Sequence, residues 1–233
     1  NNAKKTFFAY LPITIPHAAM QCPEEDVAPF RKKFPQFENK IGKYSQGTEV
    51  RNPVAAFAGM MTRMDRGVGQ VLDLLNELNI ANKTLVLFTS DNGPHYEGGH
   101  QPGFFNSNGP LKGHKRDLYE GGIRVPLIAY WPSKIKPGSI SNHICAHWDF
   151  LPTFCELAKI SIPSHTDGIS YMPTLTGRKQ KAHSYLYWEF HSYGNAQAIR
   201  MGDWKGIRLK VKNNPNAPIQ LYNLKQDIGE TKN

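Results

Sequence analysis

The sequence has 233 residues, of which 39% are hydrophobic and 20% charged, a composition that excludes a wholly disordered chain and provides for a real core. No window holds the eighteen or so apolar residues of a membrane span, and three cysteines without a Cys-x-x-Cys pair exclude a zinc ribbon and a disulfide framework. The formal net charge of +9 predicts a surface that attracts nucleic acid, but equally an anionic polysaccharide or a sulfate or phosphate ester.

The first part of the chain predicts one buried strand and one long helix. After a polar stub, residues 7–17 read as a buried strand that runs into a loop stiffened by two prolines. Residues 22–50 are rich in Pro, Lys and Glu and show no sustained period, so they predict a long surface excursion. Apolar residues then recur every three or four positions, which predicts a helix with Asn52 as N-cap, Pro53 at its first position and an end near residues 79–82.

The middle of the chain predicts an α/β architecture. Residues 84–90 and 123–132 are apolar runs that predict two buried strands, separated by a long glycine-rich loop. Because helix, strand and loop follow one another, we expect a parallel sheet that is covered on both faces. A second helix is predicted at residues 149–160, with Asp149 as its cap and Cys155 in the core.

The pattern changes near residue 184. Aromatic and polar residues alternate from there in three runs, one of them interrupted by a Gly-Asp turn, and this predicts a small antiparallel sheet. We therefore predict two parts, an α/β part at residues 1–183 and a small antiparallel subdomain, itself truncated, at residues 184–233.

Polar oxygen-bearing side chains follow directly on the strand at residues 84–90. Asp91 and Asn92, with Gly93 and a proline behind them, are good turn residues. The same two side chains supply oxygen ligands for a hard cation such as Ca²⁺ or Mg²⁺ at the carboxyl end of a strand, where open α/β sheets place their sites. Two ligands do not complete a six-fold shell, and spacing alone leaves both interpretations open.

Histidines and basic residues gather around the same loop. His17 stands at the end of the first predicted strand, although a single histidine is more often structural or surface-exposed than catalytic. Residues 112–116, Lys-Gly-His-Lys-Arg, read by default as a solvated basic turn. Their place beside a glycine pair and a buried strand indicates that they are anchored near the sheet.

Four segments together carry a family resemblance. TSDNGP, GPLKGHKRDLYEGGIRVPLIAYWP, DFLPT and LYNLKQDIGET resemble the C-terminal half of type I, formylglycine-dependent sulfatases of the alkaline phosphatase superfamily, nearest to microbial carbohydrate sulfatases. The resemblance implies a partial α/β/α sandwich of the alkaline-phosphatase-like kind, with a small antiparallel C-terminal sheet. It further implies hydrolysis of a sulfate ester of a carbohydrate.

The resemblance assigns roles to particular residues. Asp91 and Asn92 match two ligands of one Ca²⁺ ion, which draws charge from the sulfate ester. Lys115 matches the lysine that contacts the sulfate and its bridging oxygen. His17 matches the histidine that protonates or stabilises the leaving alkoxide. The expected sugar contacts are His100, His114 and Arg116.

One part of the family's machinery has no counterpart in the sequence. Sulfatases of this type carry a formylglycine made from the first residue of a Cys/Ser-x-Pro-x-Arg motif, and this sequence contains no such motif. Cys22 has the wrong spacing, and the family's other pair of aspartate ligands is also missing. We therefore expect a C-terminal fragment that is inactive by itself, from a periplasmic or secreted enzyme that requires a formylglycine-generating enzyme or an anaerobic maturase.

Other functions remain open at this stage. A phosphatase or phosphonate hydrolase of the same superfamily shares the fold, although a set of Asp and His ligands for two zinc ions is not visible. A non-catalytic relative that binds sulfated glycans would also use the net charge of +9. Nucleic-acid binding ranks last, because the basic residues are scattered and no known module occurs.

Overall fold

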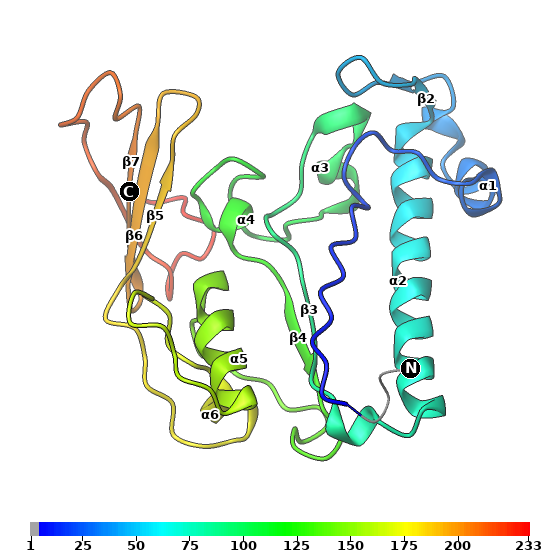
Figure 1. Cartoon of the computed structure of the whole chain (residues 1–233). Coiled ribbons are helices and arrows are strands. Elements are labelled where there is room, and N and C mark those ends of the chain that lie inside the picture. The colour runs from blue at the N-terminus through cyan, green and yellow to red at the C-terminus, as the bar shows by residue number, and fades with distance from the viewer. Residues whose placement is uncertain (1–4) are drawn as a thin grey trace. The chain divides into compact units, whose positions relative to one another are not determined.

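The computed structural model describes residues 5–233 and divides into two compact units (Figure 1). The first unit contains the chain up to residue 84 and residues 94–109; the second contains residues 85–93 and 110–233. The polar stub at residues 1–4 lies outside the described part. The predicted boundary between residues 183 and 184 stays a prediction.

The long helix of the first unit is confirmed as α2 (Pro53–Glu77). Its cap, Asn52, is fully buried in the left-handed conformation, with φ of 51°. The Asn52 Oδ1 atom accepts the Ala55 N–H at 3.0 Å, and its Nδ2 atom donates to Phe34 O and Glu38 Oε2, both at 3.0 Å. One amide side chain therefore starts the helix and ties it to the preceding segment.

The prediction of a long surface excursion at residues 22–50 agrees with the exposure of most of these residues, but the segment contains regular structure that it did not anticipate. These residues form α1 (Glu24–Lys33), the 3₁₀ helix η1 (Pro35–Phe37) and β1 (Ile41–Gly42), and β1 pairs antiparallel with β2 (Val50–Arg51). Figure 1 shows α1 beside the N-terminal end of α2. The overlooked signal was charge: α1 has acidic residues in its first turn and basic ones in its last, which suits the helix dipole.

The predicted strand at residues 7–17 is also wrong. Residues 7–14 have no regular structure, and their large side chains are exposed, with Phe8 at 71% and Tyr10 at 77%. A strand requires a lateral partner for its N–H and C=O groups, and within residues 5–233 none pairs with this segment. The remainder of the first unit comprises η2 (Ala81–Lys83), η3 (Glu97–Gly99) and α3 (Pro102–Phe105).

The second unit contains the two central strands, but they run in opposite directions. β3 (Val86–Thr89) pairs antiparallel with β4 (Leu127–Tyr130), so the expectation of a parallel sheet is wrong for this pair. Three of the four β4 residues are exposed, with Ile128 at 59%, and no third strand joins the pair in the described chain. An apolar run indicates a tendency to be buried, but it does not encode the direction of the neighbouring strand.

Helices follow β4 in the second unit: η4 (His147–Asp149), α5 (Phe150–Ala158) and α6 (Met172–Leu175), while α4 (Glu120–Ile123) precedes it. Cys155 is buried as predicted. Asp149 is the N-cap residue of α5 as predicted, but its side chain makes no cap hydrogen bond to that helix. Its buried carboxylate instead accepts the Ala146 and Ile169 N–H groups and contacts His183 Nε2, each at 2.8 Å, and so joins three segments.

The C-terminal antiparallel sheet is confirmed. Its order is β5 (Leu186–Phe190), β6 (Ala196–Met201), β7 (Trp204–Leu209) and β8 (Gln220–Asn223), and β6 and β7 are joined through the Gly-Asp turn. Alternate side chains face a core that also includes Leu118 from the loop before α4. The sheet is therefore packed against the loop that carries the predicted lysine. No helix in residues 5–233 is long and apolar enough to cross a membrane.

Candidate active site

Asp91 and Asn92 lie in a turn directly after β3. The Ser90 hydroxyl donates to Asn92 O at 3.0 Å, and Asn92 Nδ2 donates to Gly93 O at 2.8 Å. The second bond engages the amide nitrogen and leaves Oδ1 as the acceptor end of the side chain. Asp91 is exposed. The turn is therefore real, and it presents two oxygen-bearing side chains, so the turn and the ligand interpretations are compatible.

The glycines behind this turn pack against those at the start of α4. The Gly93 N–H donates to Gly122 O at 2.9 Å, and a Cβ atom on Gly93 would lie 1.8 Å from Gly121 O. A Cβ atom on Gly122 would lie 2.1 Å from Asp117 O. Only glycine permits this approach of two backbones. The strand thus gives way to glycines because two loops meet backbone to backbone.

The basic segment is a turn, as predicted, and two hydrogen bonds close it. The Asp117 N–H donates to His114 O and the His114 N–H donates to Asp117 Oδ2, both at 2.9 Å. Lys115, inside this turn, is half-buried, as is His114. Arg116 has a φ of 81° and is exposed, with its Cζ atom 6.0 Å from the centre of the Tyr193 ring.

His17 lies in the first unit, where its side chain is 40% exposed. Its Nδ1 atom contacts Ala18 O, its Nε2 atom is 3.8 Å from Glu97 Oε2, and its ring meets Tyr44 edge-on. One backbone contact and two side-chain contacts thus orient the imidazole without enclosing it.

His95 supports the turn that carries His17, a role that the sequence did not reveal. Its Nδ1 atom accepts the Glu97 N–H at 3.1 Å, so the proton is on Nε2, which donates to Pro16 O at 3.1 Å. The one available signal was its place four residues after Asp91 in the same loop.

His100 is deeply buried, which the prediction of a sugar contact did not anticipate. It is 2% exposed, its ring stacks on Phe57 at a centroid distance of 3.6 Å, and neither ring nitrogen has a hydrogen-bond partner among residues 5–233. Burial, with a smaller effect of His95, lowers the pKa of His100 to about 3. The ring is therefore neutral at pH 7.

We expect His100 to make the first unit sensitive to acid. With a folded-state pKa of about 3 and an unfolded value of 6.5, only the unfolded chain takes up this proton as pH falls below 6.5. Stability present above pH 6.5 is therefore lost as pH falls towards 3, by about 2 kcal/mol at pH 5. Urea unfolding at pH 7.5 and 5 should show that difference, and His100→Phe should remove it. The control His191→Phe, at a 75% exposed side chain, should retain the difference in stability between the two pH values. If His100→Phe also retained that difference, the acid sensitivity would not come from His100.

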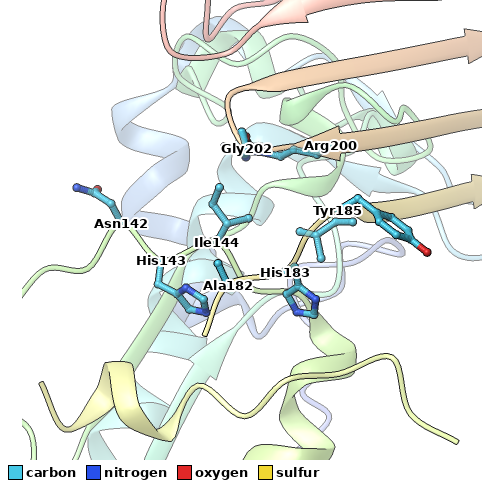
Figure 2. A pocket seen from close by; sticks show the side chains of 9 residues that line it. Asn142, His143, Ile144, Ala182, His183, Tyr185, Arg200 and Gly202 are labelled. Carbon is cyan, nitrogen blue, oxygen red and sulfur yellow. Dashed lines mark hydrogen bonds between the residues drawn. The ribbon is translucent and has the colours of Figure 1, made fainter. Parts of the chain in front are cut away.

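A separate pocket of about 210 Å³ lies in the second unit (Figure 2). Residues 142–144, 182–186 and 200–202 contribute its lining, and none of the predicted site residues is among them. His183 in its wall is the partner of the buried Asp149 carboxylate, at 2.8 Å. Burial lowers the pKa of His143, against the effect of Asp149. The Asp149 carboxylate is bonded to His183 and to two backbone N–H groups, so we interpret the His183–Asp149 pair as structural.

The predicted site residues thus fall into two groups. Asp91 and Asn92 share the second unit with His114, Lys115 and Arg116, and the glycine contact joins the two loops that carry them. His17 and His100 belong to the first unit, and their expected convergence with the others stays a prediction. Within residues 5–233 there is no group of three or more His, Cys, Asp or Glu side chains suited to a metal. The Asp91 and Asn92 oxygens fit a hard cation, but only as part of its shell.

Comparison with known proteins identifies the family. The model of the sulfatase family matches residues 1–160, and the model of the N-sulphoglucosamine sulphohydrolase C-terminal region matches residues 113–233. A sulfatase of Formosa agariphila is 31% identical over the whole chain, which covers 42% of that protein. Human steryl-sulfatase is 40% identical over 145 residues, 60% of this chain and 25% of the human one.

A solved structure agrees with these matches. The crystal structure of Ps i-CgsB with a neocarrahexaose has a TM-score of 0.75 at 31% identity, over 94% of this chain and 44% of that one. The chain belongs to the sulfatase family, and the predicted alkaline-phosphatase-like α/β fold is confirmed. It spans less than half the length of these relatives.

Proposed function

We propose that the protein to which this chain belongs hydrolyses sulfate esters of a carbohydrate. The observation that carries the proposal is the glycine contact between the Asp91–Asn92 turn and the loop of Lys115, within one unit of a sulfatase-family chain. This contact keeps a carboxylate, an amide oxygen and an ammonium group on neighbouring loops. Hydrolysis of a sulfate ester needs such groups. A cation held by the two oxygen ligands, together with the ammonium group, would oppose the charge of the sulfate and the negative charge that grows on the bridging oxygen.

The residues of the second unit bind and orient the ester. Asp91 and Asn92 would hold two positions around a Ca²⁺ ion, which supplies Lewis-acid stabilisation of the ester oxygens when bound. Lys115, half-buried in its closed turn, would place its ammonium group at the sulfate and the bridging oxygen. His114 and Arg116, on the same turn, would contact the sugar.

The residues of the first unit act on the leaving group. His17 would give its Nε2 proton to the bridging oxygen as the alkoxide departs, since an imidazole can donate a proton near neutral pH. Glu97 orients the ring from 3.8 Å, and His95 holds the preceding carbonyl. His100 would support this loop from its buried stack on Phe57, and a direct contact with the sugar would require the loop to open.

The nucleophile is proposed to come from outside these 233 residues, because the sequence has no Cys/Ser-x-Pro-x-Arg motif. In this family the nucleophile is a formylglycine, so we also propose a formylglycine-generating enzyme or an anaerobic maturase as a partner. A periplasmic or secreted location fits a polysaccharide substrate.

Release of inorganic sulfate tests the proposal. The protein encoded by the complete gene, produced with a maturation enzyme, should release sulfate from a sulfated carrageenan-type oligosaccharide, the class of ligand in the Ps i-CgsB structure. EDTA should abolish release and added CaCl₂ restore it. A steroid sulfate is a second candidate substrate, because human steryl-sulfatase is 40% identical over 60% of this chain. Release of sulfate from a steroid sulfate alone would favour that candidate. Phosphate release without sulfate release would contradict the proposal.

A further inference from the structure

Three buried charged residues form a cluster behind the loop of Lys115. Glu120, Lys205 and Glu230 have side chains that are at most 2% exposed. Lys205 Nζ donates to Glu120 Oε1 at 2.9 Å and is 3.1 Å from Glu230 Oε1, an ion-pair distance without hydrogen-bond geometry. These residues come from α4, from β7 and from the segment after β8, so the cluster joins three distant parts of the sequence.

Glu230 is bonded to both ends of the loop at residues 112–122. Its Oε2 atom accepts the Glu120 N–H at 2.7 Å, and its backbone carbonyl accepts a hydrogen bond from Lys112 Nζ at 3.1 Å. The Gly121 N–H donates to Lys112 O at 2.7 Å, which closes the loop on itself. The next residue, Gly122, accepts the Gly93 N–H at 2.9 Å. An unbroken series of bonds therefore runs from Glu230 to the Asp91–Asn92 turn.

Stability alone is a poor reason for this cluster. Charges removed from water lose hydration, and well-packed apolar residues often replace a buried ion pair without loss of stability. Burial raises the pKa of Glu230, although the Glu120 N–H and Lys205 act in the other direction. What apolar residues cannot provide is direction: the Glu230 carboxylate, held beside Lys205, accepts and so fixes the Glu120 N–H of the loop.

We propose that the Glu120–Lys205–Glu230 cluster is a positioning device for the sulfate site. It holds the loop at residues 112–122, and through Gly122 the turn after β3, so that Lys115 keeps a fixed place relative to Asp91 and Asn92. The inference rests on the proposed function. The three residues act through others and need not touch the substrate.

A double-mutant cycle tests the proposal on the protein encoded by the complete gene. Glu230→Gln keeps the shape and removes the charge, and it should lower kcat about tenfold or more. In the Lys115→Ala background, Glu230→Gln should lower kcat by less than about threefold. The contact of Lys115 with the sulfate, which Glu230→Gln would misplace, is already absent in that background. Lys205→Met, measured in the same way, provides a second variant. A loss of equal size in both backgrounds would show a merely structural role and would overturn the proposal.

Two further measurements do not depend on activity. In Glu230→Gln, amide hydrogen exchange should rise at residues 88–94 and 112–123, and Ca²⁺ affinity by calorimetry should fall about tenfold. The control Glu156→Gln, at an exposed ion pair with Arg178 in the same unit, should change neither. If the parent protein releases no sulfate, the proposed function has failed, while exchange and calcium binding still test the cluster. Unchanged exchange in both segments would overturn the positioning role.

Discussion

Replacing Lys115 by alanine is expected to lower kcat for sulfate release by about 10²-fold or more, with folding intact. The ammonium group opposes charge on the sulfate and its bridging oxygen, and removal of one such transition-state contact costs on that scale. Lys115 is half-buried within the turn that His114 and Asp117 close, and that turn does not need the lysine side chain for its own two bonds. Stopped assays of sulfate release over a range of substrate concentrations separate kcat from KM.

The matched control for this variant is Lys136→Ala, which removes an exposed lysine of the same unit. It should leave both kcat and KM within about twofold, since surface substitutions remote from the site have small effects. An unchanged kcat in Lys115→Ala would remove this residue from the mechanism. A rise in KM with kcat retained would assign it to ground-state binding only.

Gly93→Ala is expected to be nearly as damaging, for a steric reason. The added Cβ atom would lie 1.8 Å from Gly121 O, and because the clash is with backbone, one of the two loops must move. The Gly93 N–H bond to Gly122 O would be lost, and the Asp91–Asn92 turn would shift relative to Lys115. Misplacement of about 1 Å costs on the order of 10²-fold in rate, so kcat/KM should fall by that factor or more.

Gly103→Ala provides the control for the glycine variant. A Cβ atom at Gly103, in α3, meets nothing within 4 Å, and we expect activity and Ca²⁺ affinity to be retained. Calorimetric titration of Gly93→Ala with CaCl₂ should show weakened binding as well as low activity. Normal calcium affinity and normal turnover in Gly93→Ala would disprove the role of the glycine contact.

The sequence predicted best those elements whose signals are local. The α2 helix has a cap, a proline at its first position and an apolar period, and the C-terminal sheet has alternating residues and a Gly-Asp turn; both are confirmed. The α1 helix was missed because its sequence signal is the charge at its two ends, acidic in the first turn and basic in the last, and it lacks an apolar period. The direction of β4 and the exposure of residues 7–14 depend on partners distant in the chain, which local patterns do not specify.

The candidate site shows the same division. Turn chemistry and the motif around Lys115 were visible in the sequence, and the family is now shown. The backbone contact between Gly93 and Gly122 was not visible, because a tight approach depends on the fold and not on spacing. Nor did the sequence reveal that His100 is buried, or that Glu230 reaches Glu120 across 110 positions.

Peptide mass spectrometry of the protein encoded by the complete gene, coexpressed with a maturation enzyme, tests the sulfatase proposal most directly. The proposal predicts a Cys- or Ser-x-Pro-x-Arg peptide whose first residue carries the mass of the formylglycine aldehyde. A complete gene product without that motif, or with threonine at its first position, would contradict sulfate ester hydrolysis and leave a phosphatase or a glycan-binding relative.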